Sequence, residues 1–356
     1  QPWCGGYRQS LPIESGLVAH GADPTATASA IASRLIKMRV LAAPDKFKGT
    51  LTSREVAAAI GHACWELGVD CVEVPMADGG DGLLDALGGA NRETTVTGPL
   101  GDPVRAGWRM MNDTAVIEMA RASGLELAGG PEGNAALDAT TTGTGELIDH
   151  ALDAGAKRII VGLGGSATTD GGFGAIRAIS AIARLKQVEL LVACDVTTVF
   201  GDAAAVFGPQ KGATPAQVKL LERRLDRLVQ MFHEDFEFDV STIEGGGAAG
   251  GLGGALAALG GRLIPGFELV ADELGVFDLL DPEGPERVDL IVTGEGRLDA
   301  TTFDGKVVGG MAELGGDAGI PVVAIVGDAD AEVVDRHPEI ADVAVLADRF
   351  GLDRAF

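Results

Sequence analysis

A glycine-rich segment, residues 162–168 (GLGGSAT), could bind phosphate through its backbone amides. It follows an apolar run and precedes Asp170-Gly171-Gly172, so amides that no side chain shields lie beside two hydroxyls. The same glycines also fit a tight turn without a ligand, or the first loop of a dinucleotide-binding fold. A second glycine-rich run, residues 245–251, is the next candidate. The sequence has no GxxxxGK[ST] motif, which excludes an ordinary P-loop.

Carboxylates stand just after several apolar runs that read as strands. Asp45 follows VLAAP, Asp78 follows VEVPMA, Asp195 follows LLVAC, and Glu295 and Asp299 follow LIVTG. In an open α/β sheet, ligands bind beyond the carboxyl ends of the strands, and Mg²⁺ needs only one or two carboxylates beside phosphate and water. We therefore expect several of these acids to meet in one cleft. Each could instead cap the turn or helix that follows it.

Lysines adjoin glycine-bearing loops in a chain that is poor in basic residues. The chain has 52 acidic and 28 basic residues, yet glycines stand close to Lys46 and Lys48 (DKFKGT), Lys211 (GPQKGAT) and Lys306 (FDGK). This placement indicates anion binding, although a solvated surface lysine is the simpler explanation for any single one. No histidine adjoins the glycine-rich segments, so a Ser-His-Asp hydrolase is disfavoured and the expected general base is a carboxylate.

The elements that must position these residues begin at Met38 with a βαβ unit. It consists of strand RVLAAPD, helix REVAAAIGHACWELG and strand VDCVEVPMAD, with Ser53 as the expected N-cap and Gly68 as the expected helix end. Short alternating runs in residues 94–119, broken by Gly-Pro and Asn-Asp, predict antiparallel strands. A helix TTTGTGELIDHALDAG and two buried strands, KRIIVGLGG and VELLVACDV, follow.

The end of the chain returns to the alternation of its start, with RVDLIVTGEGRLD, VVGGMAELGG and PVVAIVGD. We therefore expect an α/β protein of two α/β domains. Residues 38–85 and 285–356 form a discontinuous, doubly wound Rossmann-like domain, and residues 86–284 form an inserted mixed α/β domain. Residues 1–37 lack a signal-peptide pattern and are expected to be a leader or non-native extension.

Composition excludes several classes of partner. A net charge of −24 repels nucleic acids and anionic membranes, and no apolar run is long enough to predict a membrane span. The four cysteines show neither zinc spacing nor a disulfide framework, which indicates a reduced, cytoplasmic protein. We expect a monomer or homodimer.

Many segments together resemble the bacterial glycerate kinase family (glycerate 2-kinase type), both in their order along the chain and in their residues. They include APDKFKGTLTSREVAAAI, VPMADGGDGLLDAL, IEMARASGLEL, TTTGTGELIDHAL, GLGGSATTDGGFGA, VACDV, AVFGPQKGAT, GGGAAGGLGGAL and VTGEGRLD. The resemblance covers most of residues 38–356. It implies a kinase that uses ATP and Mg²⁺ to convert D-glycerate to 2-phosphoglycerate, with the 3-phosphate as the other possible product.

The resemblance also suggests roles, because phosphoryl transfer needs mainly positioning and neutralisation of charge. Asp45 or Asp78 would accept the hydroxyl proton, and Lys48 would neutralise phosphate or the glycerate carboxylate. Asp195 or Glu295 would help to hold Mg²⁺. Nucleotide phosphate would contact a set of residues from two loops, namely Gly164, Gly165, Ser166, Thr168, Asp170 and Lys211.

The chain departs from the family pattern most clearly after GGFGAIRAI, where only a short bridge, SAIARLKQVE, precedes the next strand. The alternatives are a non-catalytic, ligand-binding relative of the family and a kinase for another small hydroxy acid. Sugar or mevalonate kinases of the GHMP type share a GLGSSA-like loop, but the surrounding segments differ. A Rossmann dehydrogenase would need its glycines where this chain has APDKFKG.

Overall fold

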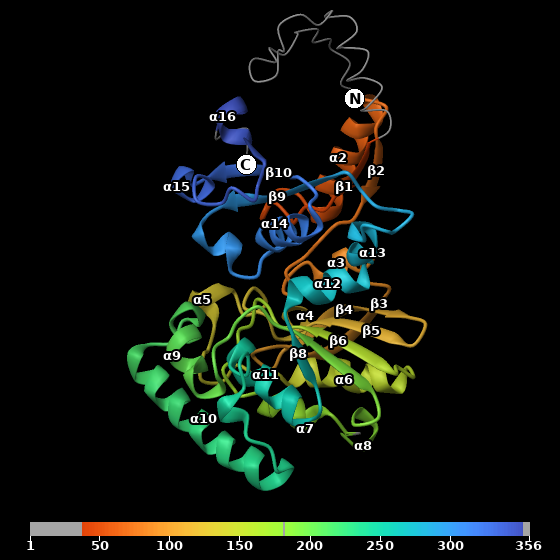
Figure 1. Ribbon diagram of the computed structural model, residues 1–356. Helices are drawn as coiled ribbons and strands as arrows, with labels where there is room; N and C mark the ends of the chain where they lie inside the picture. The colour runs from red at the N-terminus through yellow and green to blue at the C-terminus, as the bar shows by residue number, and fades with distance from the viewer. Residues whose placement is uncertain (1–37, 181, 352–356) are drawn as a thin grey trace, which may run out of the picture.

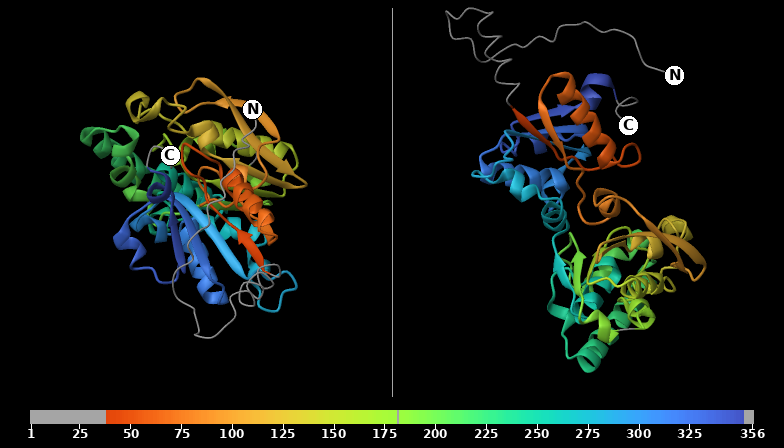
Figure 2. Two further views of the ribbon diagram at one scale, coloured as in Figure 1. Left: turned by 90° about the horizontal axis from the view of Figure 1, so that it is seen from above. Right: turned by 90° about the vertical axis from the view of Figure 1, so that its right-hand side faces the viewer.

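The computed structural model describes residues 38–180 and 182–351, which form two α/β domains, each built on its own sheet (Figure 1). The first sheet has the order β11-β10-β9-β1-β2 and the second has the order β3-β4-β5-β6-β7-β8. The chain passes between the domains twice, after β2 and after β8, so both ends of the described chain belong to the first domain. Figure 2 shows the two domains as separate lobes joined by a narrower region.

The first sheet is parallel throughout and consists of β1 (Arg39–Ala42), β2 (Asp70–Glu73), β9 (Leu290–Leu298), β10 (Val322–Ala329) and β11 (Asp342–Val345). Successive residues of a strand face opposite sides, so Val40 packs under α2 (Ser53–Glu66) while Leu41 packs under α14 (Val307–Ala318). The sheet is therefore doubly wound, as the sequence predicts. Its strand order reverses between β1 and β9, which makes the space beyond these strands a topological switch point.

The second sheet is mixed. β3 (Arg92–Thr97), β4 (Pro103–Met111) and β5 (Thr114–Glu118) pair antiparallel, as the alternating runs predict, and β6 (Arg158–Gly162), β7 (Glu189–Ala193) and β8 (Arg262–Ile264) continue in parallel. One face is covered by α6 (Thr142–Asp153), α7 (Phe173–Ala178) and α11 (Ala248–Ala258), with the long α10 (Pro215–Phe236) outside them. The remaining helices are short: α3 (Leu83–Ala86), α4 (Ala120–Ser123), α5 (Gly130–Gly133), α8 (Ile182–Leu185), α9 (Ala203–Phe207), α12 (Gly266–Glu273), α13 (Val276–Leu280), α15 (Ala331–Val334) and α16 (Leu346–Phe350).

One apolar cluster joins the two domains. It contains Leu41 of the first sheet, Ile160 of the second, and residues of α3 and α12 between them. At the same place the backbones approach so closely that a methyl group added to Gly266 would lie 2.0 Å from the carbonyl oxygen of Asp78. Glycine is therefore required there, because any side chain would push the two connecting segments apart.

The ends of α2 test two of the sequence predictions, and two other predictions stay untested. The N-cap of α2 is Thr52 rather than Ser53, because the Thr52 side chain accepts from the Glu55 amide and the Glu55 carboxylate accepts from the Thr52 amide. Gly68 follows the helix with a φ of +68°, as a terminating glycine should. The proposed leader, residues 1–37, lies outside the described residues, and the domain boundaries at residues 85/86 and 284/285 stay predictions.

Candidate active site

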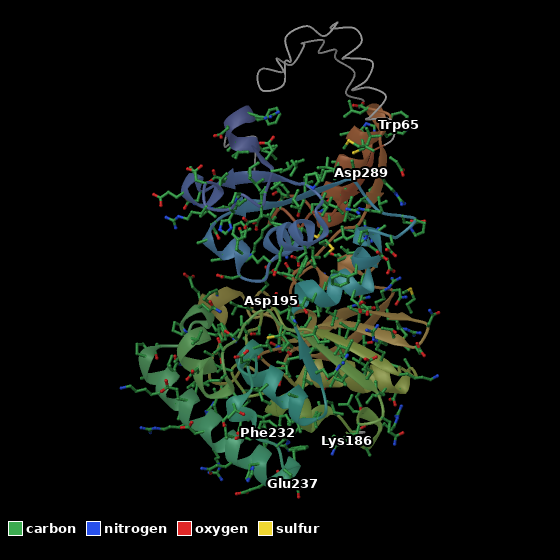
Figure 3. All side chains as sticks on the ribbon, viewed as in Figure 1. Trp65, Lys186, Asp195, Phe232, Glu237 and Asp289 are labelled. Carbon is green, nitrogen blue, oxygen red and sulfur yellow. The ribbon has the colours of Figure 1, made fainter. Side chains whose placement is uncertain are left out.

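A cleft of about 510 Å³ lies between the two sheets, where the carboxyl ends of their parallel strands face each other. Figure 3 shows Asp195 on the side of the second domain that faces the first, whereas Phe232 and Lys186 lie toward its far end. Residues from both domains line the cleft: Asp45, Lys46, Lys48, Asp78, Gly80, Asp81, Leu163, Gly164, Gly165, Asp195, Val196, Glu295, Gly296, Arg297, Asp299 and Lys306. The cleft thus contains the acids that the sequence places after its strands, and it is large enough for a small ligand.

Asp45 and Glu295 stand at the switch point of the first sheet. The Asp45 amide donates to the carbonyl oxygen of Gly294 over 2.8 Å, so the two acids leave neighbouring strands at the same level. The hydroxyl of Thr302 donates to Glu295 Oε1 over 2.6 Å and orients that carboxylate. Burial raises the pKa of Asp45 to about 6 and that of Glu295 to about 7.

Asp195 and Asp78 come from the other side of the cleft and from the connecting segment. Asp195 Oδ1 accepts from the amide of Gly266 at the start of α12 over 2.9 Å, and Asp78 Oδ1 accepts from Gly80 over 3.3 Å. Burial and then the nearby charge of Asp78 raise the pKa of Asp195 to about 7. Each acid therefore retains an oxygen that no described hydrogen bond occupies.

This donor set fits a hard divalent cation. Carboxylates from four separate segments line one partly buried cleft, and repulsion from neighbouring acids adds to the burial that raises the pKa values of Asp45, Asp195 and Glu295. A bound cation would relieve that repulsion, and Mg²⁺ binds through one or two carboxylates together with phosphate and water. Among the described residues, no three or more His, Cys, Asp or Glu side chains are grouped so that they could hold a metal ion by themselves, so a cation here would share its coordination with a ligand.

Four cations line the same cleft: Lys46, Lys48 and Lys306, which the sequence places beside glycines, and Arg297, which the sequence prediction did not select. Lys46 Nζ is 3.9 Å from Asp45 Oδ1 and donates to the carbonyl oxygen of Asp81. Lys48 also lines the cleft, together with Arg297 and Lys306, and its role in neutralising phosphate or carboxylate stays a prediction. The sequence signal for Lys46 was its position in DKFKGT beside Lys48, but only the fold shows which lysine reaches the acids.

The glycine-rich segment is divided between the cleft and the interior. Gly164 and Gly165 line the cleft, and Gly165 has a φ of +65°. Ser166 is buried and pairs with Gly124 in an isolated bridge. The chain then turns inward, so only the first half of the segment is open to a ligand.

Thr168, Asp170 and Lys211 were predicted to contact nucleotide, but none of them is among the residues that line the cleft. Thr168 and Lys211 are buried, and Asp170 is partly buried. Lys211 Nζ donates to the carbonyl oxygen of Thr168 over 2.6 Å, and burial lowers the pKa of this amine to about 7. Asp170 accepts from Thr141 N, Thr141 Oγ1, Gly172 N and Gly174 N, and burial raises its pKa. These contacts hold the loop in place, and a direct role for the three residues in binding stays a prediction without support from their position.

The second glycine-rich candidate, residues 245–251, is also buried. A methyl group added to Gly250 would lie 2.0 Å from the carbonyl oxygen of Thr168, so this run packs beneath the first loop. Its glycines permit that close approach, and they do not form an open anion site.

Comparisons with known proteins agree with the sequence resemblance. The chain matches the sequence pattern of the glycerate kinase family over residues 40–183 and 179–351, two segments that overlap where the short bridge SAIARLKQVE begins. It is 40% identical over 361 aligned residues to glycerate 2-kinase from Escherichia coli (strain K12), covering 90% of this chain and 93% of that protein. It is 39% identical to glycerate kinase from Bacillus subtilis (strain 168), with the same coverage.

A solved structure is also similar. The structure described as glycerate kinase 2 from Salmonella typhimurium LT2 superposes with a TM-score of 0.74 at 36% identity, covering 89% of this chain and 94% of that one. Among the described residues, no helix combines the length and the apolar character needed to cross a bilayer.

Proposed function

Because the chain belongs to the glycerate kinase family and is therefore a kinase, we propose that it transfers the γ-phosphoryl group of ATP to the 2-hydroxyl of D-glycerate in the cleft between its two domains, with Mg²⁺ as cofactor. We also propose that it acts in the cytoplasm. The observation that supports this proposal most is that the acids Asp45, Asp195 and Glu295 line the same cleft as Gly164 and Gly165.

The first requirement is a base for the hydroxyl proton. Asp45 is the best placed acid, since it lies at the switch point and its pKa of about 6 is close to neutral, where a general base works well. The hydroxyl oxygen forms a bond to the γ-phosphorus, the bond from phosphorus to the ADP oxygen breaks, and the proton passes to an Asp45 oxygen. Asp78, the alternative base, lies in the same cleft.

The second requirement is neutralisation of the phosphates. The amides of Gly164 and Gly165 would donate to phosphate oxygens, and Lys46 and Lys48 would supply positive charge. Asp195 and Glu295 would hold Mg²⁺, whose contribution when bound is to offset charge on the phosphates. Lys306 and Arg297 remain for the substrate carboxylate.

Turnover measurements test this proposal. The purified chain with ATP and Mg²⁺ should release ADP with D-glycerate and not with L-lactate, because the second hydroxyl, which L-lactate lacks, and the carboxylate must both be positioned. Equal rates with the two acids would contradict the substrate assignment. Enolase should consume the product without phosphoglycerate mutase, whereas a strict need for the mutase would indicate the 3-phosphate.

A non-catalytic relative is distinguished by pairing turnover with binding. Such a protein would show a thermal shift with ATP or D-glycerate but release no ADP above the background. An active kinase should show both, and its thermal shift should grow with ligand concentration.

A further inference from the structure

Glu118 is a buried carboxylate that the proposed chemistry leaves unused. It is the last residue of β5, its exposed fraction is 1%, and it lies at the same edge of the second sheet as the glycine loop. A charge at that depth is unfavourable unless it is paired and hydrogen-bonded. The hydrogen bonds that it accepts therefore indicate what it does.

Both oxygens of Glu118 are occupied. Oε1 accepts from the amide of Gly82 over 3.0 Å and from the amide of Leu84 over 2.8 Å, and Oε2 accepts from Arg121 Nε over 2.8 Å. Gly82 and Leu84 belong to the segment that connects the two domains, so a side chain of the second domain binds the connection itself.

The connecting segment carries groups into the cleft. Asp78, Gly80 and Asp81 all line it, and the carbonyl oxygen of Asp81 accepts from Lys46 on the side of the first domain. Gly79 and Gly82 have φ values of +86° and +96°, so the backbone of the segment relies on outside contacts to define its path. Glu118 provides two of those contacts directly after Asp81.

We infer that Glu118 is a positioning residue: its carboxylate fixes residues 78–84 through the Gly82 and Leu84 amides and so places Asp78, Asp81 and, through Asp81, Lys46 in the cleft. This inference rests on the proposed function for its effect on turnover, but the contacts themselves are independent of it. Arg121 balances the charge of Glu118 and has a half-exposed side chain of its own.

Three variants separate positioning from charge. Glu118→Ala removes the acceptor and should lower kcat about 10²-fold, since a displacement near 1 Å in a catalytic group has that effect. Glu118→Gln keeps an oxygen for the two amides and should retain the parent kcat, with the exposed Arg121 side chain moving to solvent. Arg121→Met is the matched control, because it removes the ion pair and leaves the amide contacts, and it should also retain kcat.

Amide hydrogen–deuterium exchange gives a second measurement that needs no turnover. Residues 79–87 should lose protection in Glu118→Ala and keep it in Glu118→Gln. If the Ala variant does not fold, exchange in the Gln variant still decides, since lost protection there would overturn the inference.

Other outcomes also overturn it. If a folded Ala variant loses protection in residues 79–87 but keeps the parent kcat, the contacts of Glu118 with residues 78–84 do not position the groups that act in the cleft. Equal loss of activity in the Ala and Gln variants would show that the negative charge of Glu118 matters, rather than its hydrogen bonds to the Gly82 and Leu84 amides. If the parent itself fails to turn over D-glycerate, the proposed function falls, while the exchange comparison still tests the contacts of Glu118.

Discussion

The two halves of the glycine-rich segment differ in environment although they are adjacent in the sequence. Gly164 and Gly165 border the cleft, while Thr168 is buried against Lys211, and Asp170, which follows the segment, is partly buried near Lys211. The first half leaves backbone amides available for a ligand. The second half uses side chains to satisfy buried backbone groups, as an interior loop requires. One motif therefore combines a binding surface with the scaffold that holds it.

The largest effect expected from this comparison is on turnover at the open half. Gly165→Val places a β-branched residue at a φ of +65° and blocks approach to the amides, so kcat should fall about 10²–10³-fold while circular dichroism stays native. Turnover within a few-fold of the parent in a folded variant would show that this half is only a turn.

For Asp170, which directly follows the buried half, we expect the opposite result. Asp170→Ala leaves the donors of Thr141, Gly172 and Gly174 without their acceptor, so the free energy of unfolding should fall by about 3 kcal/mol, measured by urea titration. Turnover of the folded fraction should change little. A large loss of kcat with parent stability would instead place Asp170 in the reaction.

The pH dependence of stability tests the burial of Lys211. Its pKa falls from an ordinary 10.5 to about 7 in the folded protein, so the unfolded chain binds more protons between these values and stability should rise with pH across that window. Lys211→Met should flatten this rise in urea or thermal unfolding from pH 7 to 10. An unchanged slope in the variant would mean that the amine is charged when folded.

For the cleft acids we expect stability to depend on pH in the opposite direction and to a smaller extent. The pKa of Asp195 rises from 3.8 to about 7, so the folded protein binds more protons in this range and stability should decrease as pH increases through it. Asp195→Asn should weaken that decrease in the ligand-free protein. A steeper decrease in the Asn variant would contradict the mutual repulsion assigned to the cleft acids.

The sequence predicted the sheets and the carboxylates of the cleft for a physical reason. Buried parallel strands read as short apolar runs, and the residue that follows such a run lies at the carboxyl edge of the sheet. That rule located Asp45, Asp195 and Glu295 near one another, and the structure brings them together. It applies equally to Glu118 at the end of TAVIE, which the sequence interpretation did not select.

Other features depend on tertiary packing that local sequence does not encode. Lys211 resembles Lys48 in its glycine-bearing surroundings, yet one amine is buried against Thr168 and the other lines the cleft. The N-cap of α2 was accessible from sequence, because Thr52 and Glu55 have the spacing of a capping box. Ser53 has a residue type that favours the N-cap, but the capping-box spacing assigns that position to Thr52.

The discontinuous first sheet also affects the order of folding during synthesis. The Arg39 amide donates to the Asp289 carboxylate across a sequence separation of 250 residues, and β1 has no central neighbour until β9 leaves the ribosome. The strands of the second domain are complete before that moment, and contacts between distant residues form slowly. Until then the apolar residues of β1 and α2 that pack against β9 stay exposed, and chaperones could bind them. The carboxylate cleft is therefore assembled in the last stage of folding.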